Sequence, residues 1–270
     1  MKIISFNANG IRSAANKGFF DWLKRQRADV VCLQETKAQE DQLTDPMFRP
    51  DGHHCFYRDA ITKKGYSGVA IYSRREPDEV RNSLGWAPFD DEGRYIEARY
   101  GKLSVVSLYV PSGSSGDERQ QFKFKVMDWI KPIFDEWLAS GRDYVLCGDW
   151  NIVRSRNDIR NWTSNQKNSG CLPAERAWLN AMIADDRGDD TPPPKKGWVD
   201  SFRVCKPDAT DEYTWWSNRG AARANNVGWR IDYQIVTPAL GKRAKACSVY
   251  RDERFSDHAP YIVGYAGAGT

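Results

Sequence analysis

The sequence has few histidines and no closely spaced cysteines. It holds three His and six Cys in 270 residues. No two cysteines form a CxxC pair, and no His stands at zinc-ligand spacing from them. This pattern argues against a thiolate zinc site. Cys32 and Cys147 lie in apolar, strand-like runs, so we expect buried, reduced thiols there.

Long apolar runs are lacking as well. No run approaches the ~20 residues that a membrane-spanning helix needs. The N-terminal segment MKIISFNANG lacks the apolar core of a signal peptide. We therefore expect no membrane partner and a cytoplasmic location with reduced thiols. No repeat or low-complexity tract divides the chain, so residues 1–270 are predicted to form one domain, with residues 185–196 as a surface loop.

Motifs for nucleotide cofactors and for serine hydrolases are also missing. Neither GxGxxG nor GxxxxGK[ST] occurs in the chain. Residues 111–118 (PSGSSGDE) are rich in glycine and serine but lack the Lys of a phosphate-binding loop. There is no GxSxG nucleophile elbow. Interpretations that depend on a nucleotide cofactor or on a serine nucleophile thus have no support.

The charge of the chain is mildly basic. The formal net charge is +4 and the pI is about 8.6, while Lys and Arg alternate with Asp and Glu along most of the sequence. Such a balance suits a polyanionic partner without requiring one. Aromatic residues make up 13% of the chain. Half-exposed aromatic rings often serve binding surfaces.

Short strand-like runs outnumber helical ones. Runs rich in Val, Ile and Tyr, bounded by Gly, Asp, Asn or Pro, predict strands at residues 2–6, 30–33, 69–72, 95–100, 103–110, 144–147, 213–216, 233–237 and 261–265. Apolar residues at three- and four-residue spacing predict helices at residues 17–27, 120–140 and 173–183. Many strands with few intervening helices favour two packed sheets with helices outside, in an α/β domain.

Polar residues stand at the ends of several predicted strands. Acids that converge on one rim of a sheet are a common way to build an α/β active site. Each acid alone could be a solvated strand end or a turn residue. Together these hard oxygen donors select Mg²⁺ or Mn²⁺ over zinc, and an added Asp–His pair suits phosphodiester hydrolysis. The set comprises Asn7, Glu35, Asp149, Asn151, Asp232, Asp257 and His258.

A series of short motifs resembles one family. The strings SFNANGIRS, LQETK, GYSGVAIYS, GRY, LYVPSG, CGDWNI, NQKNSG, ERAWL, GWRIDYQ and SDHAP occur in the order seen in the exonuclease III family, which includes the major apurinic/apyrimidinic endonucleases. The resemblance runs from Met1 to about Tyr265. It implies a DNase I-like, four-layer α/β sandwich of two mixed β-sheets flanked by helices. It also implies a monomeric DNA repair nuclease that uses Mg²⁺, with Mn²⁺ as a substitute.

The resemblance further implies roles for individual residues. Glu35, with Asn7 beside it, and Asp257 would hold the metal, together with Asp149 and Asn151. Asp149 would also activate the attacking water, while Asn151 would bond the scissile phosphate. His258, polarised by Asp232, and Tyr109 would contact phosphate oxygens. Related phosphodiesterases for lipids usually carry His near position 109, so Tyr109 favours the DNA repair branch.

The implied partner is double-stranded DNA that is damaged or has 3′ ends. Asn165, Lys167 and Asn168 would line the DNA-binding rim, and Lys64 and Arg94 would contact the DNA backbone. An apolar pocket for a flipped-out sugar or a terminal nucleotide would consist of Trp215, Trp229 and Ile231. Several relatives carry Phe where this chain has Trp215, which bears on how an abasic sugar fits.

Two alternatives to a repair nuclease remain open. The chain also resembles the catabolite repression control proteins of pseudomonads, which share the fold, lose catalytic acids and act with RNA-binding partners. A phosphodiesterase for lipids or inositol phosphates is the other alternative. The intact GDWN motif and the presence of Glu35, Asp232, Asp257 and His258 favour the nuclease. The motifs do not rank 3′-to-5′ exonuclease or 3′-end processing above incision 5′ to an abasic site.

Overall fold

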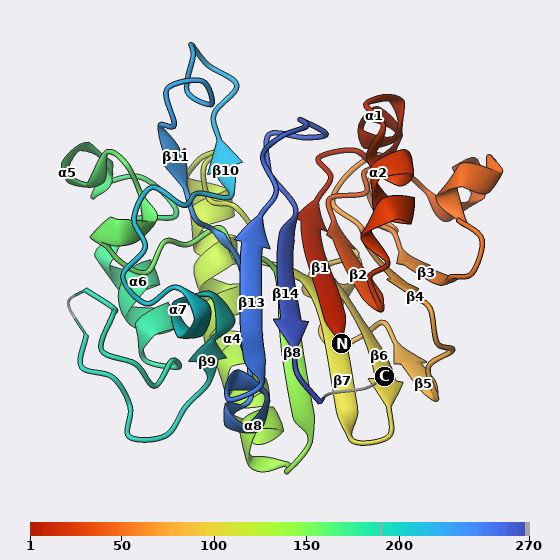
Figure 1. The fold of residues 1–270 in the computed structure, drawn as a ribbon. Coiled ribbons are helices and arrows are strands. Elements are labelled where there is room, and N and C mark those ends of the chain that lie inside the picture. Colours follow the sequence, from red (N-terminus) through yellow and green to blue (C-terminus); the bar gives the residue numbers. More distant parts are fainter. Residues whose placement is uncertain (190, 268–270) are drawn as a thin grey trace.

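Two six-stranded sheets pack face to face in the computed structural model, which describes residues 1–189 and 191–267 (Figure 1). The first sheet has the order β13 (Ala244–Val249), β14 (Tyr261–Tyr265), β1 (Lys2–Asn7), β2 (Val30–Gln34), β4 (Val69–Ser73), β3 (His54–Arg58). The second has the order β5 (Glu79–Arg81), β6 (Tyr95–Tyr100), β7 (Leu103–Tyr109), β8 (Asp143–Asp149), β12 (Asp232–Val236), β9 (Val199–Asp200). Both sheets are mixed, since β1–β2 and β7–β8 are parallel pairs and the other pairs are antiparallel.

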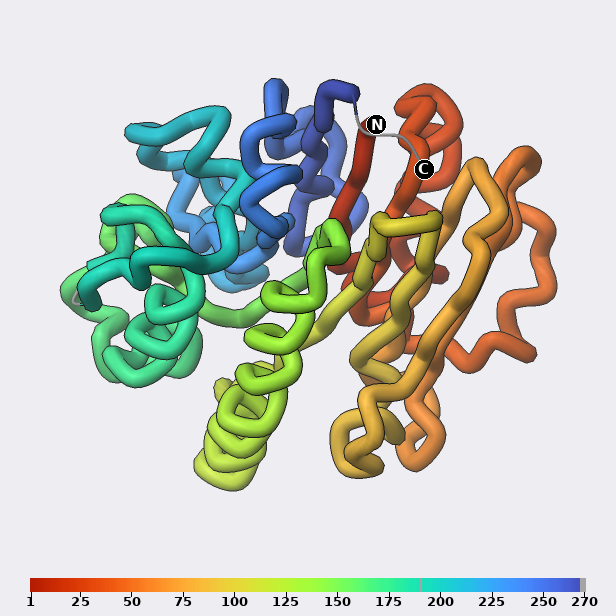
Figure 2. The backbone as a smooth tube through the Cα atoms, turned by 90° about the horizontal axis from the view of Figure 1, so that it is seen from below, coloured from red at the N-terminus to blue at the C-terminus, as the bar shows by residue number. Residues whose placement is uncertain are grey.

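Helices cover the two outer faces of the paired sheets (Figure 2). Helices α1 (Ile11–Asn16) and α2 (Phe19–Gln26) lie on the side of the first sheet, and α4 (Asp117–Ala139) and α6 (Pro173–Asn180) lie on the side of the second. A two-stranded hairpin, β10 (Trp215–Trp216) and β11 (Gly228–Trp229), stands at the top in Figure 1. The short elements are α3 (Ala87–Asp90), α5 (Trp162–Asn165), α7 (Ser201–Cys205), α8 (Pro238–Gly241), η1 (Glu40–Gln42), η2 (Pro46–Phe48) and η3 (Arg156–Asp158).

The core has a separate cluster for each interface between layers. In β2, Val30 and Cys32 face the second sheet, whereas Val31 and Leu33 pack with the cluster that contains α2. This alternation follows from the two-residue period of a strand. On the far side, outward residues of β7 and β8 pack against α4. The three interfaces confirm the predicted four-layer sandwich.

The predicted inner strands are confirmed, and the missed ones lie mainly at sheet edges. The predictions at 95–100 and 261–265 match β6 and β14 in full. The edge strands β3, β5, β9 and β13 were not predicted. They are short or half exposed, so they lack a strong apolar alternation. The strand predicted at 213–216 reduces to the two residues of β10.

The helix predictions hold apart from their boundaries. The helix expected at 17–27 begins at Phe19, because Gly18 adopts a left-handed φ of 85° and separates it from α1. Residues 185–196 contain no helix or strand among their described positions, as the loop prediction requires. Asp190 and residues 268–270 lie outside the described residues. Within the described part of the chain, no helix combines the length and hydrophobicity needed to cross a bilayer.

A network of buried charges supports the end of the second sheet near Asp232. Asp158 accepts from Arg230 at 2.7 Å and from Arg203 at 2.6 Å, and Asp200 accepts from Arg230 at 2.8 Å. Burial would raise the pKa of Asp158, but the two guanidinium groups outweigh it and hold that pKa well below its ordinary value. Because Arg230 precedes Ile231 and Asp232 in the chain, the network fixes this part of the backbone.

Replacing Asp158 with Asn should destabilise the fold. The change leaves the buried guanidinium of Arg203 without its charge partner and leaves Arg230 paired with Asp200 alone, and breaking a buried ion pair typically costs about 3–5 kcal/mol of the free energy of unfolding. Urea unfolding at pH 7 measures the loss. The matched control is Asp135→Asn, which breaks an exposed pair with Lys131 and should cost less than about 1 kcal/mol.

The pH dependence gives a second check on the same variant. Since folding depresses the pKa of Asp158, its contribution is present above an unfolded pKa of about 3.9 and fades as the pH falls further. The stability gap between wild type and variant should therefore narrow in acid. A gap under about 1 kcal/mol at pH 7 would contradict the role given to this network.

Candidate active site

Backbone register brings polar residues from both sheets to one rim. Parallel pairing of β7 with β8 places Tyr109 beside Asp149, and antiparallel pairing of β8 with β12 places Asp232 opposite Asp149. In the first sheet, Asn7 ends β1 and pairs with the residue just before Glu35. These strand ends point to the side of the molecule that carries the β10–β11 hairpin (Figure 1). The predicted convergence of strand ends is therefore what the structure shows.

Asn7 connects the two sheets at this rim. Its Nδ2 donates to Glu35 Oε1 at 2.8 Å and to Asp149 Oδ2 at 2.9 Å, and its Oδ1 accepts from the backbone of Asn9 at 2.9 Å. The Asn7 side chain is fully buried and does not line the pocket. Its amide thus fixes the separation of two carboxylates, whatever else they bind.

Glu35 sits on a strained turn beside a lysine. Its φ is 50°, an uncommon conformation for a residue with a side chain, and the turn directs its carboxylate to the rim. Lys37 Nζ lies 2.7 Å from Glu35 Oε2 and also contacts Asn9 Oδ1. Burial would raise the pKa of Glu35, but Lys37 and the amide of Asn7 outweigh it and lower the pKa. Glu35 is therefore ionised at neutral pH.

Asp149 differs from Glu35 and Asp257 in that its pKa is raised. Asn151, whose own φ is 51°, donates its backbone N–H to Asp149 Oδ1 at 2.8 Å and its Nδ2 to Oδ2 at 3.2 Å. Burial, together with the charges of Asp232 and Glu35, raises the pKa of Asp149 to about 8, although His258 opposes the shift. A bound cation at this position would oppose both causes and favour the ionised carboxylate.

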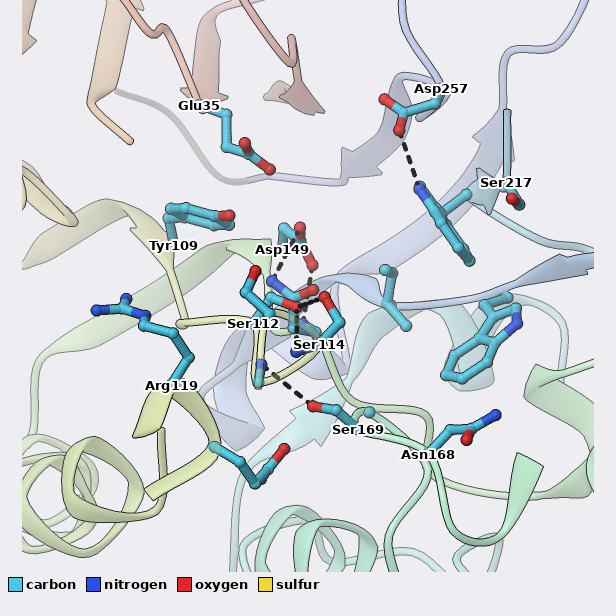
Figure 3. Close-up of a pocket in the computed structure, with 18 of the residues that line it drawn as sticks. Glu35, Tyr109, Ser112, Ser114, Arg119, Asp149, Asn168, Ser169, Ser217 and Asp257 are labelled. Atoms are coloured by element: carbon cyan, nitrogen blue, oxygen red, sulfur yellow. Dashed lines mark hydrogen bonds between the residues drawn. The ribbon is translucent and has the colours of Figure 1, made fainter. Parts of the chain in front are cut away.

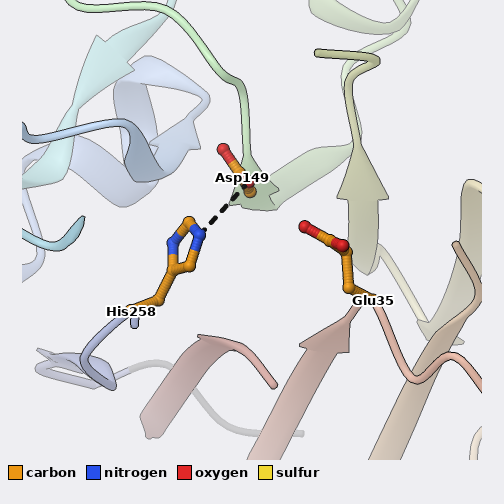
Figure 4. A group of neighbouring side chains, drawn as sticks. All are labelled: Glu35, Asp149 and His258. Carbon is orange, nitrogen blue, oxygen red and sulfur yellow. Dashed lines mark ion pairs between the residues drawn. The ribbon is translucent and has the colours of Figure 1, made fainter. Parts of the chain in front are cut away.

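His258 is held by Asp232 and carries a positive charge. Its Nδ1 lies 2.8 Å from Asp232 Oδ2, and its Nε2 lies 3.8 Å from Asp149 Oδ2 (Figure 4). Burial would lower the pKa of His258, but the carboxylate of Asp232 outweighs it and raises the pKa to about 10. The other oxygen of Asp232, Oδ1, is buried without a hydrogen-bond partner. The ring therefore offers Nε2–H as a donor at neutral pH.

The rim suits a divalent cation. Ligand-type atoms of Glu35, Asp149 and His258 all lie within 4.8 Å of one another, and Figure 4 shows the three side chains directed toward a common point. A protonated His258 donates hydrogen bonds, so the carboxylates would supply the ligands. Asp257 lines the same pocket, and the charge of His258, together with hydrogen bonds from Asn9 and Trp215, keeps its pKa low despite burial. Carboxylate oxygens are preferred ligands of hard cations.

An open pocket of about 1040 Å³ adjoins the carboxylates (Figure 3). One wall is apolar and is formed by Trp215, Trp229 and Ile231, the predicted trio. The two indole rings meet edge to face with centroids 5.8 Å apart. Two loops, residues 112–116 and 167–172, form much of a second, polar wall. The pocket thus places an apolar recess and a polar wall next to the same acids.

The segment NQKNSG reaches the pocket in part. Lys167 and Asn168 are exposed and line it. Asn165 does not line it, and its side chain instead donates to Asn161 O at 2.7 Å and accepts from Asn168 at 2.8 Å. Lys64 is exposed but lies outside the pocket wall. The roles of these residues in DNA binding stay predictions.

The prediction for Arg94 needs correction. Its side chain is 1% exposed, pairs with Glu92 at 2.6 Å and donates to the carbonyl oxygen of Tyr109 at 3.1 Å. The guanidinium also stacks 4.5 Å from the centre of the Tyr109 ring. Arg94 is therefore enclosed beneath Tyr109 and supports it, and in this position it does not reach a DNA backbone.

Unlike Arg94, Arg119 is only partly buried, and it was not among the predicted site residues. It lines the pocket, binds Glu92 through two hydrogen bonds of 2.9 and 3.0 Å, and donates to Tyr66 OH at 2.9 Å. Its place in the first turn of α4, directly after the glycine- and serine-rich loop, was the available signal. Lys37, which stands two residues after Glu35 in LQETK, was also missed.

Comparisons with known proteins agree with this geometry. The model of the endonuclease/exonuclease/phosphatase family matches residues 4–258. An exodeoxyribonuclease of Bacillus subtilis is 35% identical over 263 residues, which is 96% of this chain and 97% of that protein. The DNA repair nuclease APEX1 of Danio rerio is 34% identical over 264 residues, 97% of this chain and 81% of that protein. The structure of the 3′ phosphatase NExo from Neisseria, bound to a product DNA hairpin, has a TM-score of 0.82 at 27% identity and covers 98% of this chain and 99% of that one. The chain belongs to the endonuclease/exonuclease/phosphatase family.

Proposed function

We propose that this chain is a Mg²⁺-dependent DNA repair nuclease that hydrolyses the phosphodiester backbone. Its reactions would be 3′-to-5′ exonuclease action and 3′-end processing on duplex DNA, incision 5′ to abasic sites, or both. The observation that carries this proposal is the cluster of Glu35, Asp149 and His258, with His258 Nδ1 held 2.8 Å from Asp232, at the mouth of a pocket with an apolar wall. Relatives named as an exodeoxyribonuclease and as a DNA repair nuclease support it.

The carboxylates and the histidine would divide the chemistry between them. Glu35, Asp149 and Asp257 would hold the cation, which when bound supplies positive charge against the scissile phosphate. Asp149 would accept a proton from the attacking water, with its oxygens oriented by Asn151 and Asn7. His258 would donate from Nε2 to a phosphate oxygen, because Asp232 occupies Nδ1 and keeps the ring protonated.

The pocket would accept the DNA around the cleaved bond. Trp215, Trp229 and Ile231 would pack against a deoxyribose or a terminal nucleotide. Tyr109 would donate its hydroxyl to a phosphate oxygen. Lys167 and Asn168, together with other donors on the polar wall, would bind the DNA backbone without reading sequence. We further propose that the chain acts as a single domain and as a monomer.

The first test is a paired cleavage assay with Mg²⁺. One labelled duplex carries a central abasic analogue and the other a recessed 3′ end, and each is incubated with and without EDTA. We expect metal-dependent cleavage of at least one duplex. The ratio of the two rates shows whether 3′-to-5′ exonuclease action or incision at abasic sites predominates. If the folded protein binds either duplex yet cuts neither, with Mn²⁺ also tried, the nuclease proposal fails and a silent binding protein replaces it.

Substitution of the two central groups should remove turnover. His258→Ala and Asp149→Asn each delete a group that acts on charge or on a proton in the transition state, so single-turnover rates should fall on the order of 10²- to 10⁴-fold. The control His54→Ala removes an exposed histidine at the start of β3 and should leave the rate unchanged. A near-normal rate for either variant, with folding intact by circular dichroism, would rule out its assigned role.

Glu35→Gln should act through the metal. Replacing a charged ligand with an amide of the same shape should raise the Mg²⁺ concentration for half-maximal cleavage by at least about tenfold, since loss even of an outer contact typically costs 10- to 100-fold. Isothermal titration with Mn²⁺ measures the same effect without turnover. Glu40→Gln, on the same connection but exposed, is the control. An unchanged metal titration would remove Glu35 from the ligand set.

A further inference from the structure

A buried ion pair lies behind the polar wall of the pocket. Lys123 Nζ of α4 is 2.6 Å from Glu175 Oε1 of α6, and both side chains are 0% exposed. Neither side chain lines the pocket. Burying two charges costs much of the energy that their attraction returns, so such a pair contributes little net stability. The contribution of the pair therefore lies in the backbone groups that Lys123 and Glu175 bind.

Lys123 holds the turn that orients Asp149. Its Nζ also donates to the carbonyl oxygen of Asn151 at 2.8 Å. Asn151 has the left-handed φ of 51°, and its side chain donates to Val110 O at 2.9 Å as well as to Asp149. The ammonium group thus fixes the backbone of a strained residue whose amide groups position the central carboxylate.

Glu175 holds the two loops of the polar wall. Its Oε2 accepts from the backbone of Gly170 at 2.6 Å and of Leu172 at 3.1 Å. Its Oε1 accepts from Ser169 at 3.5 Å, and the Ser169 hydroxyl accepts from the backbone of Gly113 at 3.1 Å (Figure 3). One carboxylate therefore ties residues 167–172 directly, and residues 112–116 through a single hydroxyl.

The parts joined in this way have little room to shift separately. A Cβ atom at Gly170 would lie 2.8 Å from Asn151 O and 3.1 Å from the ring of Trp229. Gln120 of α4 adds a further hydrogen bond to Glu175 at 3.1 Å, close to Gly113. The loop, the Asn151 turn and the apolar wall are in contact, so a displacement of one moves the others.

We propose that Lys123 and Glu175 are a positioning pair. The pair holds loops 112–116 and 167–172 and the Asn151 turn in fixed positions relative to Asp149. The pair sets where the DNA backbone rests relative to the reacting groups, and it touches neither substrate nor cation. This inference rests on the proposed nuclease function. Apolar residues of similar size would remove the buried charges, but they would not hold these backbone groups.

The double variant Lys123→Met/Glu175→Leu tests the proposal, because neither new side chain can hold the backbone groups. It removes both buried charges together, so the urea midpoint should fall less than in Glu175→Leu alone, which leaves the Lys123 ammonium buried without its charge partner. Single-turnover cleavage should slow about 10- to 100-fold, because displacements near 1 Å can cost 10²-fold in rate. Hydrogen exchange should rise in residues 112–116 and 167–172 while the sheets stay protected. The affinity for the recessed duplex in EDTA should also fall.

A matched control separates positioning from stability. Glu97→Gln alters another buried carboxylate, which pairs with Arg99 at 2.8 Å on β6 and lies outside the pocket. It should lower the urea midpoint without changing the cleavage rate or the exchange of the two loops. Ser169→Ala is a second, milder variant that removes the hydroxyl between the loops. It should raise exchange at Gly113 and raise KM about two- to tenfold, the effect of one lost hydrogen bond.

The outcomes distinguish this inference from the proposed function. A double variant with a rate within about twofold of wild type, or with unchanged loop exchange, overturns the positioning role. Should the double variant not fold, unchanged exchange and KM in Ser169→Ala overturn it instead. If wild type cleaves neither duplex, the nuclease function fails. Hydrogen exchange of the two loops in the variants does not depend on cleavage activity, so it still decides whether the pair holds the loops.

Discussion

The structure depends on forcing acidic groups together at one rim, against their mutual repulsion. Backbone hydrogen bonds fix Asp149 and Asp232 on neighbouring strands, so these carboxylates cannot move apart without breaking the second sheet. Glu35 approaches from the first sheet on a strained turn. Burial, together with the charges of Asp232 and Glu35, raises the pKa of Asp149. In the proposed function, a bound cation and a protonated His258 would favour the ionised carboxylate, which would couple the electrostatics of the fold to the chemistry.

Hydrogen bonds between the sheets decide whether the two halves of the rim meet. Gln234 of the second sheet donates to Ile3 O and Tyr261 O of the first, both at 3.2 Å, deep in the apolar interface. At the rim itself, Asn7 completes the connection to Asp149. Apolar packing alone is non-directional and would tolerate sliding of one sheet over the other. These directional bonds define one offset, and therefore one distance between Glu35 and Asp149.

The sequence predicted the centre of the sandwich better than its margins, for a physical reason. Inner strands are buried on both faces and read as apolar runs that end in polar residues, so their strand ends identify Glu35, Asp149 and Asp232. Edge strands such as β13 are half exposed and carry no comparable signal. Arg94 was misplaced because a long charged side chain is buried only when paired. Its partner Glu92 stands two residues earlier, but the sequence does not show that the pair folds under Tyr109.

Trp215 connects the apolar wall of the pocket to Asp257. Its ring forms part of the apolar wall, and its Nε1 donates to Asp257 Oδ2 at 3.2 Å. A phenylalanine at this position would fill much of the same recess but could not donate to the carboxylate. In the proposed function, the bulkier indole would narrow the space for an abasic sugar while it orients Asp257. The choice between trimming a 3′ end and incising at an abasic site would then depend, through Trp215, on how firmly Asp257 is held.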